Sequence, residues 1–141
     1  MLKQFVSGLV LVVASALVNI SVTVAASHAA EPGLMPQISE QQGIKVTATP
    51  QAISGESKIW IVEVTMETHT RSLGDDMGKA AVLVVDGKTY APMNWEGSPP
   101  GGHHRKGLLR FDVIEPQPAQ LELQLRLSVD AAPRSFRWRM H

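Results

Sequence analysis

Apolar and polar residues alternate with a period of two along much of the chain after residue 43. In the clearest segment, 58–70, one set of alternate positions is apolar: Trp60, Val62, Val64 and Met66. Successive side chains of a β-strand point to opposite faces, so this pattern predicts a strand with one buried face. The predicted strands are 44–49, 58–70, 80–85, 88–90, 108–113, 121–129 and 136–140.

Turn-forming residues separate these strands. Asp86-Gly87 is typical of a two-residue hairpin turn, and the range 91–107, with three Pro and four Gly, predicts a long loop. No segment has the periodicity of an amphipathic helix. Short strands with turns between them predict an all-β domain over residues 43–141, an antiparallel immunoglobulin-like β-sandwich of about seven strands. The range 30–42 has no clear period and predicts a flexible lead-in.

The N-terminal residues 1–29 are typical of a secretory signal peptide. Lys3 gives a positive start, an apolar stretch runs from 5 to 26, and small residues occupy positions 27 and 29. We therefore predict cleavage after Ala29 or Ala30 and a periplasmic or secreted protein that meets the membrane only before cleavage. The alternative is an uncleaved membrane anchor, because the apolar stretch is nearly long enough to span a bilayer.

Composition narrows the function classes. The chain of 141 residues has 13 Lys plus Arg and 13 Asp plus Glu, so its formal net charge is zero. Nucleic-acid-binding proteins generally carry excess positive charge, so we expect no nucleic-acid partner. The chain has no Cys, which excludes disulfides, thiolate metal sites and cysteine nucleophiles.

The range 91–107 also holds a pair of adjacent histidines, His103 and His104, directly after Gly101-Gly102. His69 ends a predicted strand, and Asp75 follows in the next loop. If these two loops meet at one end of the sandwich, three imidazoles and a carboxylate would suit zinc or copper(II). The alternatives are that the histidines and Arg105 brace the loop by hydrogen bonds to backbone carbonyls, or that the loop binds a partner.

The remaining candidate residues favour structural roles. Trp95 either anchors the long loop against the sandwich or belongs to a recognition surface, and we favour the anchor because large aromatic side chains usually bury their area. There is no nucleophile elbow, phosphate-binding loop or His-Glu-x-x-His helix in the sequence. Three arginines near the C-terminus suggest a small positive strip on a solvated face: Arg134, Arg137 and Arg139.

Several short motifs follow one another along residues 44–140, the most distinctive being the Gly-Gly-His-His-Arg loop, 101–105. The others are 68–70 with Leu73 and Asp75, 90–92, 95–97, 107–111 and 134–138. Their order resembles an uncharacterised family of small secreted bacterial β-sandwich proteins. The resemblance implies a periplasmic domain of this type, with no established activity and no assigned ligands.

Together these features predict a periplasmic binding module that is not an enzyme. It would bind a metal ion or an envelope protein through the loops 68–76 and 95–107. The alternative is a structural or protein-interaction module without metal. A third hypothesis is a metal-dependent hydrolase, for which Glu96 is the candidate general base.

The signal peptide predicted at residues 1–29 can be tested directly. Intact-mass measurement of the protein purified from the extracytoplasmic fraction should give a chain that begins at Ala30 or Glu31. A chain that retains residues 5–26 would instead support the membrane anchor.

Overall fold

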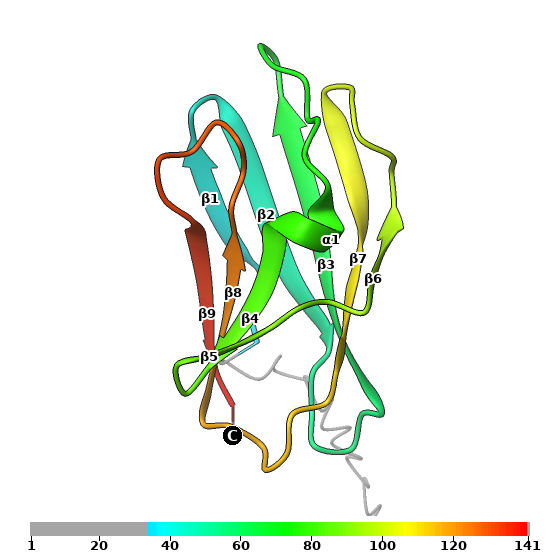
Figure 1. Ribbon diagram of the computed structural model, residues 1–141, viewed down its shortest axis with the longest axis vertical. Coiled ribbons are helices and arrows are strands. Elements are labelled where there is room, and N and C mark those ends of the chain that lie inside the picture. The colour runs from blue at the N-terminus through cyan, green and yellow to red at the C-terminus, as the bar shows by residue number, and fades with distance from the viewer. Residues whose placement is uncertain (1–33, 141) are drawn as a thin grey trace, which may run out of the picture.

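Two antiparallel β-sheets pack face to face in the computed structural model, which describes residues 34–140 (Figure 1). The five-stranded sheet has the order β1 (Gln37–Gln41), β2 (Ile44–Ala52), β3 (Ile59–Thr68), β7 (His104–Asp112), β6 (Asn94–Gly97). The four-stranded sheet has the order β5 (Lys88–Tyr90), β4 (Ala81–Val85), β8 (Gln120–Leu125), β9 (Arg134–Arg139). A single helical turn, α1 (Met77–Ala80), precedes β4. The predicted sandwich of two antiparallel sheets is confirmed.

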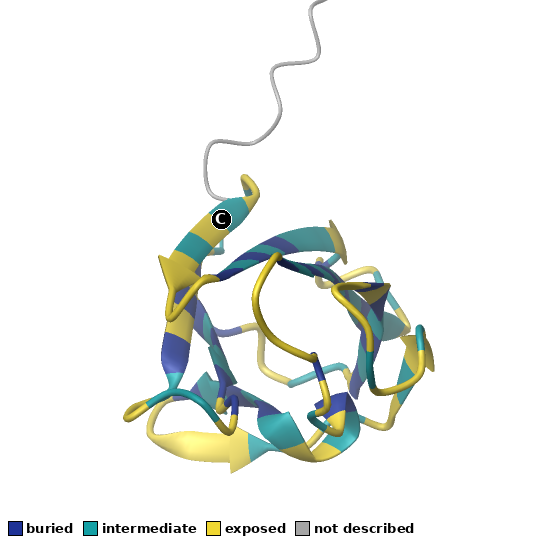
Figure 2. Ribbon diagram, turned by 90° about the horizontal axis from the view of Figure 1, so that it is seen from above, coloured by how far each residue is buried: buried dark blue, intermediate teal, exposed yellow. Residues whose placement is uncertain are grey.

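The core lies between the two sheets, as the alternation along the strands predicts. In β3 every second residue from Trp60 to Thr68 is buried and the residues between them are partly exposed. Figure 2 shows buried bands on the strands of both sheets around the interior. The core includes four aromatic side chains, those of Trp60, Phe111, Phe136 and Trp138.

The hairpin predicted at Asp86-Gly87 is also confirmed. Asp86 has a φ of 50° and Gly87 a φ of 78°, and Val85 pairs with Lys88 across them. Two successive left-handed residues form the type I′ turn, whose twist matches that of the flanking strands. Glycine adopts this conformation without steric cost, and Asp tolerates it better than most residues.

Three expectations are wrong. The described part of the range 30–42, expected as a flexible lead-in, contains strand β1, and the range 91–107, expected as a loop, contains β6 and the start of β7. The strand count over residues 34–140 is therefore nine rather than about seven. Both β1 and β6 are edge strands with mostly exposed residues, so they lack the apolar alternation that reveals a half-buried strand.

One buried arginine joins the two sheets. Arg134, at the start of β9, forms a bidentate ion pair with Asp130, with Nε–Oδ2 and Nη2–Oδ1 distances of 2.7 and 3.1 Å. The side chains are 0% and 1% exposed, respectively. The same guanidinium donates to the carbonyl oxygens of Gln41 and Ile44 at 2.9 and 2.8 Å. Arg134 therefore does not belong to an exposed positive strip, because it shares the core face of β9 with Phe136 and Trp138.

Side chains also close the seam between the edge strands β1 and β9. The side-chain amide of Gln37 donates to the carbonyl of Arg137 and accepts from its backbone N–H. The indole Nε1 of Trp138 donates to the carbonyl of Met35 at 2.8 Å. Strand β1 is paired with β2 in the five-stranded sheet, and these bonds also attach it to β9 of the four-stranded sheet.

The predicted signal peptide, 1–29, and the alternative anchor lie outside the described residues. No helix within residues 34–140 is long and apolar enough to cross a membrane.

The Arg134–Asp130 pair gives a stability prediction. Replacing Asp130 by Asn leaves a buried guanidinium without its carboxylate, so the free energy of unfolding should fall by about 3–5 kcal/mol. Lys45→Gln is the control, because it breaks an exposed pair with Glu67 and should cost less than about 1 kcal/mol. Urea denaturation measures both changes, and equal effects would contradict the role assigned to Arg134.

Candidate functional site

The two loops of the predicted metal site do meet, at the end of the sandwich where β3 ends and β7 begins (Figure 1). The backbone N–H of Thr68 donates to the carbonyl of His103 at 3.0 Å. Leu73 donates to Gly102 at 3.0 Å and accepts from Gly101 at 2.8 Å. Gly101 and Gly102 have φ values of 114° and 72°, which other residues rarely adopt.

A guanidinium lies at the centre of this corner. Arg105, the second residue of β7, is 2% exposed. Its Nη1 donates to the carbonyls of Leu73 and Asp75 at 3.0 and 2.6 Å, and its Nη2 donates to the carbonyl of Ser98 at 3.2 Å. These bonds join three loop carbonyls that no strand pairing satisfies. The expectation that Arg105 can brace the loop through backbone carbonyls is therefore confirmed.

The charge of Arg105 is balanced only at a distance. Burial lowers the pKa of its guanidinium, while the nearby carboxylates of Asp75 and Asp76 act in the opposite direction. Neither carboxylate bonds to it: Asp75 accepts from the backbone N–H of Ser128 at 2.9 Å, and Asp76 caps α1 through Gly78. The Nε atom of Arg105 is buried and has no hydrogen-bond partner. An arginine remains charged under these conditions, so the corner holds a fixed internal cation.

The four predicted metal ligands do not converge. His69, His103 and His104 are exposed, and the carboxylate of Asp75 is bound to Ser128. His104 lies 3.9 Å from Glu67, measured from Nδ1 to Oε1, on the outer face of the sheet. Over the described range, no group of three or more His, Asp or Glu residues is arranged to hold a metal ion. The physical reason is the strand: neighbours on β7 point to opposite faces, so His104 faces solvent and Arg105 the interior.

Trp95 anchors the loop, as the sequence favours. Its indole Nε1 donates to the carbonyl of Ser98 at 3.0 Å, and its ring lies 5.7 Å from the Arg105 guanidinium carbon. The ring also covers Gly107, where an added Cβ would lie 2.6 Å from Trp95 Cζ2 and 2.7 Å from the Cα of Gly97. Two facing glycines on β6 and β7 thus make the space that the indole fills.

The outer face of the five-stranded sheet carries charges that are largely paired. Three cross-strand contacts are formed on it: Lys45–Glu67 at 3.5 Å, Lys106–Glu63 at 3.3 Å and Arg110–Glu96 at 2.8 Å. Glu96, the candidate general base of the hydrolase hypothesis, is therefore held in an ion pair. Exposed pairs of this kind contribute little to stability, and they are typical of a solvated face.

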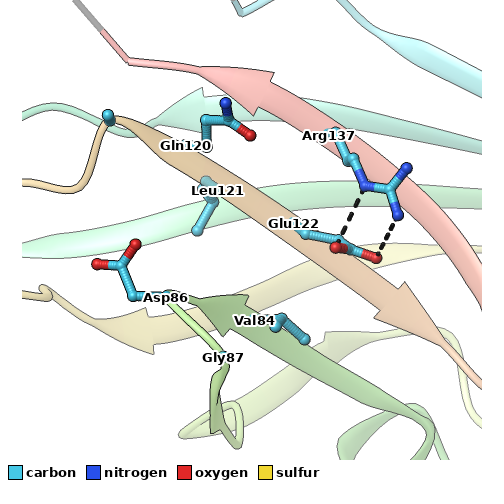
Figure 3. A pocket seen from close by; sticks show the side chains of 8 residues that line it. Val84, Asp86, Gly87, Gln120, Leu121, Glu122 and Arg137 are labelled. Atoms are coloured by element: carbon cyan, nitrogen blue, oxygen red, sulfur yellow. Dashed lines mark hydrogen bonds and ion pairs between the residues drawn. The ribbon is translucent and has the colours of Figure 1, made fainter.

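The outer face of the four-stranded sheet instead contains a shallow concavity of about 350 Å³ (Figure 3). It lies where the β4–β5 hairpin meets β8 and β9. Its lining residues are Val84, Asp86, Gly87, Ala119, Gln120, Leu121, Glu122 and Arg137. Pockets with a few convergent polar groups are the usual places for ligands, and this volume suits a small one.

Glu122 is the best-supported polar group of this concavity. Its Oε1 accepts from Ser135 at 2.6 Å and from Gln124 at 2.9 Å, and its Oε2 lies 3.2 Å from Arg137 Nε. Burial alone would raise the pKa of Glu122, but these hydrogen bonds and the positive charge of Arg137 hold it below its ordinary value. The carboxylate is therefore ionised and fixed in place at neutral pH.

Two further charged side chains border the concavity, and each can form additional ion pairs or hydrogen bonds. The exposed carboxylate of Asp86 forms no ion pair with any residue between 34 and 140. Arg137 uses Nε and Nη2 toward Glu122, and its side chain is 69% exposed. The sequence predicted the Asp86 turn but not this site, because the site needs the register of three strands. The one feature of the sequence that pointed to the site was the alternation along 121–129 and 136–140, which places Glu122 and Arg137 on solvent-facing positions.

Comparison with known proteins adds no assignment: no family model, no curated protein and no solved structure matches the chain. The resemblance to small secreted β-sandwich proteins stays a prediction.

The glycine pair beneath Trp95 gives a sharp test. Gly107→Ala places a Cβ against the indole and the facing backbone, so the free energy of unfolding should fall by about 1–3 kcal/mol. The matched control is Gly74→Ala, because an added Cβ there meets nothing within 4 Å. Thermal and urea unfolding should show little change or slight stabilisation for the control. A Gly107→Ala protein as stable as the control would show that Trp95 does not depend on this space.

Proposed function

We propose that this protein is an extracytoplasmic binding module without enzymatic activity, and that it takes a small ligand on the outer face of its four-stranded sheet. The observation that carries the proposal is the concavity of about 350 Å³ bordered by the unpaired carboxylate of Asp86 and the partly used guanidinium of Arg137. The secretory pattern of residues 1–29 supports the compartment.

The contrast between the two outer faces supports this choice. On the five-stranded sheet, Lys45, Lys106 and Arg110 are each paired with a glutamate across the strands. A ligand there would have to displace those partners. On the four-stranded sheet the hairpin carboxylate has no such partner, so a ligand gains an interaction without breaking one. The five-stranded sheet also has an exposed carboxylate without an ion pair among residues 34–140, Asp112 at the end of β7, but Asp112 does not line the concavity. The combination of an unpaired carboxylate and a concavity therefore favours the four-stranded sheet.

The loop corner gives less support for a ligand site. Arg105 occupies its interior and directs its donors to carbonyls of the same chain. Its role is explained by loop bracing alone, which was the alternative to a metal site. The proposal therefore keeps the binding-module class expected from the sequence and places the ligand on a different surface.

The test is a nitrogen-15 NMR titration of the protein purified from the extracytoplasmic fraction. The probes are ethylammonium, acetate, glycine and triglycine, followed by zinc as a separate arm. We expect chemical-shift changes confined to residues 84–87, 119–122 and 137, and smaller changes in Asp86→Asn. Asp112→Asn is the control, because Asp112 is an exposed carboxylate that does not line the concavity.

Two outcomes would overturn this proposal. One is the absence of shifts with every organic probe. The other is a saturable zinc response centred on residues 69 and 103–104, which would restore the metal-binding hypothesis.

A further inference from the structure

We propose that the ligand of this concavity is a short zwitterion of about tripeptide length, with its ammonium group at Asp86 and its carboxylate at Arg137. This inference rests on the proposed function and names its ligand class. Figure 3 shows Asp86 and Arg137 on opposite sides of the hollow, with residues of β8 between them. The arrangement thus offers one negative and one positive site. The carboxylate of Glu122 lies between them, but it is already paired with Arg137 at 3.2 Å.

Strand register sets the separation of the two charges. Val84 pairs with Glu122, and Glu122 pairs with Arg137, so these three residues form one row across the sheet. Asp86 lies two residues beyond Val84. Two inter-strand spacings and a two-residue rise place the backbones of Asp86 and Arg137 about 12 Å apart. The two side chains shorten this gap, and a tripeptide spans up to about 10 Å when extended.

The surface between the two charges suits a peptide backbone. Gly87 has no side chain, and nothing lies within 4 Å of the position its Cβ would take. The side-chain amide of Gln120 borders the concavity and can both donate to a peptide carbonyl and accept from a peptide N–H. Val84 adds apolar surface beside them. The carboxylate of Glu122 also lies on this surface, but Ser135, Gln124 and Arg137 already occupy it. A ligand with charged ends and a polar, uncharged middle therefore matches this order of groups.

The fixed carboxylate of Glu122 gives Arg137 its orientation. The contacts at 3.2 and 3.4 Å hold Nε and Nη2 toward Glu122. The Nη1 group makes no hydrogen bond with another residue of the described range, so it can donate to a ligand carboxylate. Because Ser135 and Gln124 already donate to Glu122, that carboxylate is a poorer acceptor for an ammonium group than Asp86. The ammonium end is therefore assigned to the hairpin.

The experiment compares three peptides of equal length. Triglycine has both charges, N-acetyltriglycine lacks the ammonium group, and triglycinamide lacks the carboxylate. NMR titration should give triglycine an affinity about tenfold or more above that of either capped peptide, since each charged hydrogen bond contributes about one such factor.

Substitutions then assign each end. Asp86→Asn should remove the preference for triglycine over N-acetyltriglycine, and Asn is well tolerated in this left-handed turn position. Arg137→Gln should remove the preference over triglycinamide. Asp112→Asn should leave both preferences intact, and proton spectra confirm that each variant is folded.

The outcomes separate the two proposals. If all three peptides bind the concavity equally, the zwitterion assignment is wrong and the proposed binding module stands. If the preferences persist in Asp86→Asn and Arg137→Gln, the assignment of the ends is wrong. If no probe binds at this face, both proposals fail.

Discussion

Two buried guanidinium groups hold together the end of the sandwich at which β2 and β7 begin. Arg105 collects the carbonyls of residues 73, 75 and 98, and Arg134 collects those of residues 39, 41 and 44. The first three carbonyls lie in loops, and the other three lie in β1 and at the start of β2. A carbonyl oxygen can accept two hydrogen bonds, and arginine presents five N–H groups in a fixed plane that reaches several such oxygens at once. Each arginine therefore joins several backbone segments by hydrogen bonds from one side chain.

Burying a charged guanidinium costs free energy, and different groups offset that cost for Arg134 and for Arg105. Arg134 has a carboxylate in direct contact, and both side chains of the pair are almost fully buried. Arg105 has only carbonyl dipoles and an aromatic ring nearby, with Asp75 and Asp76 acting from farther away. The second arrangement leaves the buried Nε–H without a hydrogen-bond partner, so the donors of Arg105 are less fully used than those of Arg134.

Much of the fold could be predicted from local alternation, because a half-buried strand has a period that a single sequence displays. Strand β3 and the β4–β5 hairpin are examples. Strands β1 and β6 could not be found this way, since an edge strand with exposed residues has no apolar period.

The burial of Arg134 was visible in the pattern but not predicted from it. Arg134 lies on the same face of β9 as Phe136 and Trp138, two and four residues later, but a charged residue is normally expected on the surface. The bracing of the loops by Arg105 was among the alternatives that the sequence offered. The sequence did not show that His104 faces solvent, because the register of β7 decides whether His104 or Arg105 points inward. The concavity depends on the pairing of β4, β8 and β9, which no local pattern contains.

The contact between Gln37 and β9 has a consequence for how the protein behaves at high concentration. A free edge strand presents unpaired N–H and C=O groups that can recruit a strand from another molecule. Here one side-chain amide occupies both backbone groups of Arg137, in the middle of the β9 edge. An incoming strand would have to displace Gln37 before it could pair in register. The polar side chain of β1 thus protects the four-stranded sheet against edge-to-edge aggregation along β9.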